Sequence, residues 1–395
     1  MSAPAAVIVA LNAGSSSVKF SAFEADADGV SDHALIKGQV SGIGDRPALE
    51  LTDAHGAHTE TDLSADGADH ATAFNHGLDA LQAAIGARRV LAVGHRVVHG
   101  GREFAGPTLI DPSAMARMAA LSPLAPGHQP HNLSGVRLAQ AHWPDAPHVA
   151  CFDTAFHRTQ PRIRQLFALP RSFAEDGVLR YGFHGLSYDY IAHAAPEIIG
   201  EAGRGRLVVA HLGAGASLCA IQAGESVAST MGFTALDGLP MATRCGAIDA
   251  GVLLYLMERK AMGAADLNRL LYKQSGLKGL SGISGDMRDL LASDAPEAED
   301  AVALFVDRVA RGIADMAACL GGIDVLVFTA GIGEHAAPIR ARVVEACAWM
   351  GFALDAQANT AHGPQISHSD HPSAWVIPTQ EDWVVAQAAR EAVRN

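Results

Sequence analysis

The most informative stretch for the architecture is Val7-Ile-Val-Ala-Leu11, with the turn that follows it, Asn12-Ala-Gly-Ser-Ser-Ser-Val-Lys19. Its apolar, β-branched residues predict a buried strand, and its small polar residues predict a tight turn into a second strand that contains Lys19. A similar stretch lies 200 residues later, where Leu207-Val-Val-Ala is followed by Gly213-Ala-Gly-Ala-Ser-Leu218. Two strand–turn–strand units of this kind indicate a duplicated fold, with two similar halves around one cleft.

Other short apolar runs alternate with longer helical patterns, and each run ends at a glycine-rich or polar turn. This alternation predicts an α/β architecture in which ligands bind near the carboxyl ends of the strands. The runs are Val90–Val93, Val149–Phe152, Leu207–Ala210 and Val325–Phe328.

Two further segments are expected to be peripheral or terminal elements. The polar stretch from Gly44 to Asp69 predicts loops and a hairpin at the edge. The stretch from Glu381 to Arg394 predicts a final helix, whose apolar residues are Trp383, Val384, Ala388 and Val393.

The composition excludes several classes of protein. A chain of 395 residues has room for two or three domains, and its 49% hydrophobic and 18% charged residues exclude a disordered tail or a coiled coil. With 29 Lys+Arg against 42 Asp+Glu, the net charge is −13, so we expect no nucleic-acid partner, and any anionic ligand must meet local cations. No window has 18 consecutive apolar residues, and five scattered cysteines fit a reduced cytoplasm. We expect a cytoplasmic protein that does not span a membrane.

Two glycine-rich turns are candidate phosphate sites. In the turn from Asn12 to Lys19, amides and hydroxyls can approach an anion, and Lys19 adds a charge. It is not a Walker A loop, because the lysine falls in a following strand and no helix begins there. The Gly-x-Gly turn in His211–Ser217 can cradle phosphate in the same way. An ordinary hairpin is the alternative for each.

A third turn, Thr329-Ala-Gly-Ile-Gly-Glu-His335, also satisfies the dinucleotide pattern G-x-G-x-x-A when Ala336 is included. A dinucleotide site would need a second strand with an acidic residue about 20 residues further on. Asp355 is near that spacing, but no clear strand precedes it, so a nicotinamide cofactor is disfavoured.

Several charged side chains stand in apolar or glycine-rich surroundings. Arg96 and Arg244 each lie beside glycines, where either an anionic ligand or a structural ion pair would satisfy them. Asp153 ends an apolar run, and His184 lies between glycines. A zinc site is rejected, because no third ligand accompanies the two histidines of His95–His99, and no G-x-S-x-G elbow supports a serine hydrolase.

Together these segments resemble the acetate kinase family, and through it the superfamily of acetate and sugar kinases, Hsp70 and actin. The resemblance runs from Val7 to Ala389. It implies two actin-like (RNase H-like) α/β domains of βββαβαβα type around a central cleft. The implied domains are residues 1–152 with 383–395, and residues 153–382, which would bind the adenosine. It also implies a homodimer.

The resemblance implies a reaction and roles for individual residues. The reaction is reversible, Mg²⁺- or Mn²⁺-dependent transfer of the γ-phosphate of ATP to acetate by direct in-line attack, giving acetyl phosphate and ADP. Asn12 and Glu381 would hold the metal, and Asp153, Arg96, Arg244 and His184 would be catalytic. Arg96, Val98 and Phe183 would contact the acyl substrate. The implied ATP-binding residues are Ser15, Ser17, Lys19, His211, Leu212, Gly213, Ala214, Gly215, Asp286, Met287, Arg288, Gly331, Ile332, Gly333, Glu334 and His335.

The chain departs from the family pattern at a few of these places. Ala214 replaces a common asparagine in the second turn, and Cys245 and Ala247 replace a serine and an aspartate. Gly127 replaces a leucine and Ala235 a proline at positions that line the acyl pocket, so we expect propionate to be tolerated better than usual. The alternatives are a propionate, butyrate or sugar kinase of the same superfamily, or a non-catalytic ATP-binding protein.

Overall fold

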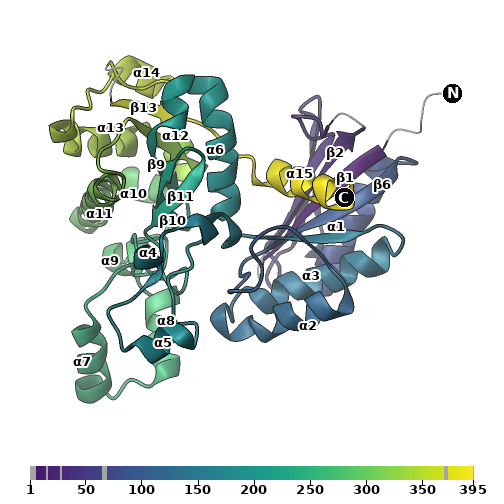
Figure 1. Ribbon diagram of the computed structural model, residues 1–395, viewed down its shortest axis with the longest axis horizontal. Helices are drawn as coiled ribbons and strands as arrows, with labels where there is room; N and C mark the ends of the chain where they lie inside the picture. The colour runs from purple at the N-terminus through teal and green to yellow at the C-terminus, as the bar shows by residue number, and fades with distance from the viewer. Residues whose placement is uncertain (1–5, 15–16, 27–28, 65–68, 369–371, 395) are drawn as a thin grey trace. The chain divides into compact units, whose positions relative to one another are not determined.

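The computed structural model describes residues 6–14, 17–26, 29–64, 69–368 and 372–394. The chain divides into two compact units, of which unit 1 contains residues 1–156 and 380–395, and unit 2 contains residues 157–379 (Figure 1). These boundaries differ from the expected ones, which follow residues 152 and 382. The difference matters for the site, because Asp153 and Glu381 belong to the same unit as Arg96.

Unit 1 is built on an eight-stranded sheet with the order β5-β4-β3-β2-β1-β6-β8-β7. Strand β1 pairs antiparallel with β2 and parallel with β6, and β6 pairs parallel with β8. The strands are β1 (Ala6–Ala13), β2 (Val18–Ala25), β3 (Ile36–Ser41), β4 (Ala48–Asp53), β5 (His58–Asp62), β6 (Arg89–Val97), β7 (Thr108–Leu109) and β8 (His148–Phe152).

Helices cover both faces of this sheet, which explains why β1 is apolar at nearly every position. Val7, Val9 and Leu11 point to one face and share a core with Phe74 and Leu78 of α1. Helix α15 packs on β1, β6 and β8. The helices of unit 1 are α1 (His70–Ile85), α2 (Pro112–Ala120), α3 (Gln129–His142) and α15 (Glu381–Arg394), with a 3₁₀ turn at Ser122–Leu124.

The close approach of α15 depends on Gly94 in β6. A Cβ atom at this position would lie 2.5 Å from Val385 and 3.2 Å from Ala389, so only glycine leaves room for the helix. The predicted final helix is confirmed, but its buried face was only partly identified. Val384 is buried as expected, whereas Trp383, Ala388 and Val393 are half-buried. The face that packs on the strands is instead completed by Val385, Ala386, Ala389 and Arg390.

Unit 2 is built on a five-stranded sheet with the order β11-β10-β9-β12-β13. Strand β9 pairs antiparallel with β10 and parallel with β12, and β12 pairs parallel with β13. The strands are β9 (Arg206–Leu212), β10 (Ala216–Gln222), β11 (Glu225–Ser229), β12 (Val325–Thr329) and β13 (Ser373–Val376).

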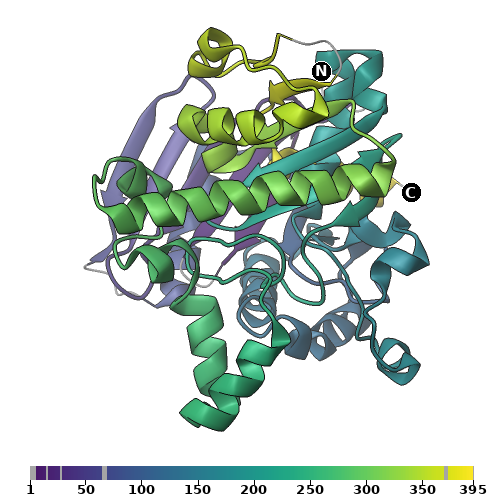
Figure 2. The same ribbon diagram turned by 90° about the vertical axis from the view of Figure 1, so that its left-hand side faces the viewer.

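The helices of unit 2 include one long apolar-faced helix, α11, which packs on β9, β10 and β11 and crosses the view in Figure 2. The others are shorter, and α7 and α8 extend away from the sheet in both views. The helices are α4 (Arg162–Gln165), α5 (Arg171–Glu175), α6 (Gly185–Ile199), α7 (Ala250–Lys260), α8 (Ala264–Lys273), α9 (Gly276–Ser281), α10 (Met287–Leu291), α11 (Pro296–Leu320), α12 (Ala330–His335), α13 (Ala337–Ala346) and α14 (Ala356–Thr360), with 3₁₀ turns at Ala155–Thr159, Glu201–Arg204 and Ala348–Met350.

The two sheets share one topology, which confirms the duplication inferred from the sequence repeat. In unit 1 the strands β3-β2-β1-β6-β8 follow each other across the sheet, and in unit 2 the strands β11-β10-β9-β12-β13 do so in the same order and directions. Unit 1 adds β4, β5 and β7 at its edges. This is the expected doubled α/β fold.

The expected peripheral hairpin also agrees with the structure. The segment from Gly44 to Asp69 contains the β4–β5 hairpin at the sheet edge, and β5 is fully exposed. None of the helices among the described residues is both long and apolar enough to cross a membrane. The five cysteines are free thiols.

Candidate active site

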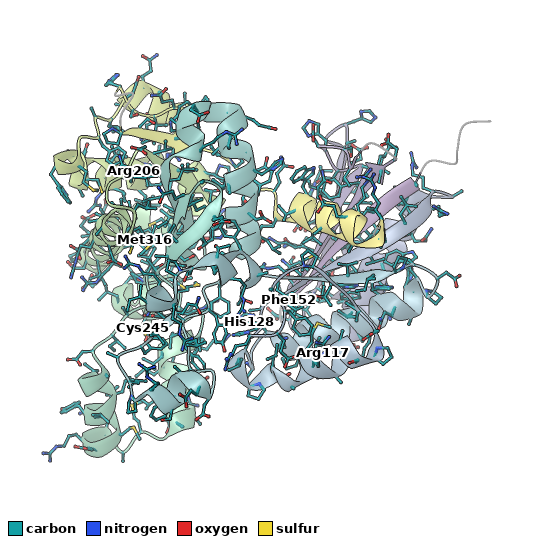
Figure 3. The ribbon with its side chains drawn as sticks, in the orientation of Figure 1. Arg117, His128, Phe152, Arg206, Cys245 and Met316 are labelled. Atoms are coloured by element: carbon teal, nitrogen blue, oxygen red, sulfur yellow. The ribbon has the colours of Figure 1, made fainter. Side chains whose placement is uncertain are left out.

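In unit 1, three candidate residues lie together because three neighbouring parallel strands end at the same edge of the sheet. Leu11 of β1 pairs with His95 of β6, so Asn12 and Arg96 follow at the same level. Arg96 pairs with Cys151 of β8, and the amide of Asp153 donates to Val97 O at 3.1 Å. Asp153 thus comes directly after Phe152, which is labelled in Figure 3. The carboxyl ends of such strands are the usual place for a ligand.

Arg96 is held by two carboxylates. Its Nε and Nη2 donate to the two oxygens of Asp153 at 2.9 and 2.7 Å, and its Nη1 lies 3.5 Å from Oε2 of Glu381. Burial alone would lower the pKa of Arg96, but the charges of Asp153 and Glu381 outweigh it and raise that pKa. The guanidinium is therefore permanently charged and fixed in orientation, because a bidentate pair leaves it little freedom.

Glu381 reaches this edge as the first residue of α15. Burial raises the pKa of its carboxyl, Arg96 and Lys19 oppose the rise, and Asp153 and Asp382 add to it. The neighbouring Asp382 accepts a hydrogen bond from Ser21 Oγ at 2.6 Å, which fixes the start of α15 on β2. A cation beside Glu381 would therefore stabilise its ionised form.

The first glycine-rich turn connects β1 and β2, as predicted. Asn12 is half-buried and pairs with Lys19, which lies exposed on β2. Gly14 N donates to Ser17 O at 2.8 Å and closes the turn. Ser15, a predicted ATP-binding residue, lies outside the described residues.

The loop after β6 is fixed by two polar side chains of α3 that sequence reasoning missed. Asn132 donates to Ala13 O at 2.7 Å and accepts from Val98 N at 3.0 Å, so it joins the ends of β1 and β6. Gln129 accepts from His99 N and donates to His99 O. Both side chains are buried polar groups, and a lone Asn or Gln on an otherwise apolar helix face is the signal that could have revealed them.

Gly127 lies in the loop before α3 and is exposed. A Cβ atom at this position would meet no atom within 4 Å. The position therefore has room for the Cβ atom of a larger residue.

In unit 2, the second glycine-rich turn connects β9 and β10, again as predicted. Gly213 N donates to Gly215 O at 3.0 Å, and Ala242 N donates to Ala214 O at 3.2 Å. Residue 214 is thus tied through its backbone to the loop that carries Arg244, and it needs no side chain for that contact. Leu212 is fully buried, so its side chain belongs to the core.

His184 lies against this turn, a proximity that its distance in the sequence concealed. Its Nδ1 is 2.8 Å from Ser217 Oγ, and its ring stacks on His211 with centroids 4.2 Å apart. His211 is in turn 2.8 Å from Ser187 Oγ through its own Nδ1. Phe183 is buried, and its carbonyl lies 2.9 Å from His157 Nε2.

Arg244 differs from Arg96 in having no carboxylate partner within the described part of the chain. Its Nη1 donates to Ala235 O at 2.9 Å and contacts the Met241 sulfur at 3.5 Å. Burial lowers its pKa, with a small opposing effect of Tyr272. Cys245, labelled in Figure 3, follows it and has a thiol whose pKa burial raises. A half-buried cation of this kind is electrostatically incomplete without an anion.

The third glycine-rich turn begins α12, directly after β12. Ala330 has φ of 65°, and Glu334 Oε1 accepts its amide at 2.8 Å and that of Thr379 at 3.2 Å. The Glu334 carboxylate therefore holds the turn, and it also fixes the last residue of unit 2. Gly331 and His335 are exposed, Ile332 is half-buried and Gly333 is buried.

Arg340, which sequence reasoning missed, holds α12 from its other end. It is completely buried, and it donates through Nη1 to the carbonyls of Gly333 and Glu334, both at 2.9 Å. Its other nitrogens contact Asn359 and His362. Burial lowers its pKa to about 10.

The predicted nucleotide contact at Asp286–Arg288 is an internal ion pair. Arg288 Nη2 lies 2.6 Å from Asp286 Oδ2, and Asp286 also accepts the amide of Arg288 at the start of α10. Met287 is buried and packs in the core.

Comparison with known proteins identifies the family of this chain. A family profile described as "Acetokinase family" matches residues 7–387. The chain belongs to the acetokinase family.

Individual acetokinase relatives support the same assignment over nearly the whole chain. An acetate kinase of Rhodopseudomonas palustris is 50% identical over 386 residues, which cover 96% of this chain and 97% of that one. A propionate kinase from Francisella tularensis has a TM-score of 0.90 at 33% identity, covering 98% and 99% of the two chains. An acetate kinase of Porphyromonas gingivalis has a TM-score of 0.87 at 34% identity, covering 98% and 100%.

Proposed function

We propose that this protein is an acetate kinase that transfers the γ-phosphoryl group of ATP to acetate, giving acetyl phosphate and ADP, and that the reaction is reversible. A carboxylate oxygen attacks phosphorus in line, and the bond from phosphorus to the β–γ bridging oxygen breaks. The observation that carries the proposal is the pair of guanidinium groups. Arg96 is oriented by Asp153 and Glu381, and Arg244 is half-buried without a carboxylate partner among the described residues.

The chemistry explains why cations, and not a strong base, dominate the candidate residues. Acetate is already ionised at neutral pH, so no proton has to be removed from it. The obstacle is the repulsion between two anions, and phosphoryl transfer is catalysed mainly by positioning and charge neutralisation. Arg96 and Arg244 would supply the charge, and His184 would donate a hydrogen bond. Asp153 would orient Arg96.

The donor set fits a bound Mg²⁺ ion, or Mn²⁺ in its place. Asn12 and Glu381 offer an amide oxygen and a carboxylate, both hard oxygen ligands, and the raised pKa of Glu381 marks a carboxylate that a cation would stabilise. Among the described residues no group of three or more His, Cys, Asp or Glu side chains could hold a metal by itself. This matches Mg²⁺, which commonly keeps water and substrate phosphate as its other ligands. The ion would neutralise phosphate charge and orient the leaving group.

The nucleotide would bind through the three glycine-rich turns. Backbone amides of Ser17 and Gly215 and the charge of Lys19 suit phosphate, and the open space at Gly331 suits the adenosine. His335 and the Asp286–Arg288 pair are exposed groups that adenosine could contact.

Trapping with hydroxylamine tests the reaction directly. Purified protein, ATP, Mg²⁺ and acetate should give acetyl hydroxamate, and omission of Mg²⁺ should abolish it. A sugar kinase would phosphorylate hexoses and form no hydroxamate. A non-catalytic protein would bind ATP and form none.

The preference among short acyl substrates is a finer question, because a propionate kinase is among the similar structures. By the family resemblance, Gly127, Ala235, Val98 and Phe183 would line the acyl pocket, and the small residues at positions 127 and 235 would enlarge it. Because one methylene is worth about 1–3 kcal/mol, the preference could shift tenfold or more. Comparing kcat/KM for acetate, propionate and butyrate measures the acyl preference. Gly127→Leu, at a position with room for a Cβ atom, should lower the propionate-to-acetate ratio of kcat/KM about tenfold. An unchanged ratio would show that Gly127 does not line the acyl pocket.

We also propose that the protein acts as a homodimer in the cytoplasm. None of the residues of α7 is buried, and Leu254, Tyr255 and Met257 are about half exposed. An apolar helix left on the surface suits a second copy of the chain. Sedimentation equilibrium at micromolar concentration should give twice the mass of one chain. The free, mostly buried cysteines suit a reducing compartment.

A further inference from the structure

His184 is held in a strained backbone position. It has φ of 59° and ψ of 23°, in the left-handed region, at the N-terminal cap of α6. Gly182 also has positive φ, and a Cβ atom there would lie 2.5 Å from the ring of His157. A bulky residue keeps such a conformation only where its surroundings enforce it, and this strain is often found at functional sites.

The surroundings of the His184 ring distinguish its two nitrogens. Nδ1 lies 2.8 Å from Ser217 Oγ. Nε2 points to the glycine-rich turn, because a Cβ atom built on Gly215 would lie 3.2 Å from it. One face of the ring stacks on His211, with an angle of 22° between the planes. The nitrogen that faces a bound phosphoryl group would therefore be Nε2.

The partner on Nδ1 is itself part of a buried chain of hydroxyls. Ser217 is fully buried, and its Oγ also lies 2.5 Å from the hydroxyl of Tyr188, which is buried too. Ser217 has one proton to donate, so it can donate either to His184 or to Tyr188. The direction of this chain decides which nitrogen of His184 carries the proton.

We propose that Tyr188 and Ser217 are positioning residues that fix the tautomer of His184. Tyr188 O–H donates to Ser217 Oγ, Ser217 O–H donates to Nδ1 of His184, and the neutral imidazole keeps its proton on Nε2. That N–H then donates to an equatorial oxygen of the transferring phosphoryl group. This inference rests on the proposed function for the identity of the acceptor, but the tautomer is a property of the free protein.

The opposite direction is disfavoured by electrostatics. If Nδ1 carried the proton, Nε2 would present a lone pair to phosphate oxygens that are themselves acceptors. A doubly protonated ring would place a cation against the stacked ring of His211. A neutral donor avoids both costs, and it needs no proton transfer during the reaction, since acetate has no proton to lose.

Nuclear magnetic resonance tests the tautomer without any turnover. In protein labelled with ¹⁵N-histidine, long-range ¹H–¹⁵N correlations separate protonated from unprotonated ring nitrogens, and the His184→Gln spectrum identifies the signals of His184. We expect an unprotonated Nδ1 and a protonated Nε2 at neutral pH. A protonated Nδ1 in the unmodified protein would overturn the inference. This outcome does not depend on whether acyl phosphate is formed.

Kinetics of three variants test the two positioning residues. Ser217→Ala should populate both tautomers and lower kcat about tenfold or more, with KM for ATP changed less than twofold, because the lost hydrogen bond acts in the transition state. Ser217→Thr keeps a hydroxyl and should restore both the tautomer and most of kcat. Tyr188→Phe should give an intermediate kcat.

A matched control separates this effect from the loss of a buried hydroxyl. Ser367 is also buried, and its Oγ accepts from Ala374 N at 3.0 Å in another part of unit 2. Ser367→Ala should lower the thermal midpoint but leave kcat unchanged. If Ser217→Ala reduces kcat no more than Ser367→Ala does, or reduces it while His184 keeps its tautomer, the positioning role is wrong. An unmodified protein without acyl phosphate formation would instead reject the proposed function.

Discussion

Asp153→Asn separates two roles for the Asp153 carboxylate, which is almost completely buried in unit 1. Asp153 is 2% exposed and gives both oxygens to Arg96. Asparagine has nearly the same shape, but it would turn an NH₂ donor toward Arg96 and remove the charge. A hydrogen bond to a charged group is worth about 1.5–3 kcal/mol, which corresponds to a decrease in kcat of about 10- to 150-fold if the guanidinium loses its orientation.

A double-mutant cycle with Arg96→Ala tests whether Asp153 acts through Arg96. The rate of hydroxamate formation at saturating ATP and acetate would be measured for both single variants and the double variant, from pH 6 to 9. If Asp153 acts only through Arg96, the double variant is as slow as Arg96→Ala alone, and the shape of the pH profile stays the same. Additive losses would show that Asp153 acts independently of Arg96, and a displaced pH optimum in Asp153→Asn would show that its own ionisation matters. Thermal unfolding of each variant checks that the fold is retained.

Three further predictions concern other parts of the molecule. Arg244→Met should raise the thermal midpoint, because it removes a half-buried charge that has no carboxylate partner among the described residues, and it should lower kcat about 10³-fold. A lower midpoint would contradict this explanation. Glu334→Ala should raise KM for ATP and destabilise the protein by about 1–3 kcal/mol, because the amide of Ala330 in the strained turn loses its acceptor. Glu334→Gln keeps an acceptor oxygen, so its KM and its stability should be close to those of the unmodified protein. Burial lowers the pKa of His99 to about 4, so the unfolded chain binds a proton below pH 6.5 that the folded protein does not. Between pH 7 and pH 5, stability to urea should fall by about 2 kcal/mol more in the unmodified protein than in His99→Gln, and an equal fall in both would refute this.

The architecture could be predicted from the sequence because it depends on local patterns. Each apolar run that ends at a polar turn became a strand, and the resemblance between the Val7 and Leu207 segments correctly indicated a repeated topology. The boundaries between the two units were harder to predict from the sequence. They depend on which sheet the residues beside Asp153 and Glu381 join, and contacts between the two ends of the chain determine that.

The site residues divide in the same way. Arg96, Arg244 and His184 could be recognised because charged side chains in glycine-rich surroundings are unusual. The role of Asn132 could not be, since its partner is the carbonyl of Ala13, 119 positions away. The role of Glu334 could not be predicted from its motif. Its carboxylate accepts the amides of Ala330 and Thr379, and only the fold brings Thr379 close to it.

The return of α15 to unit 1 has a consequence for biosynthesis. On the ribosome, unit 2 emerges as one continuous segment, but the sheet of unit 1 stays uncovered at Gly94 until Val385 and Ala389 have been made. A chain that stalls within unit 2 therefore exposes apolar strands to the cell and lacks Glu381. Such fragments would be inactive and prone to aggregation. Unit 1 therefore becomes stable and complete only when the last helix has been translated.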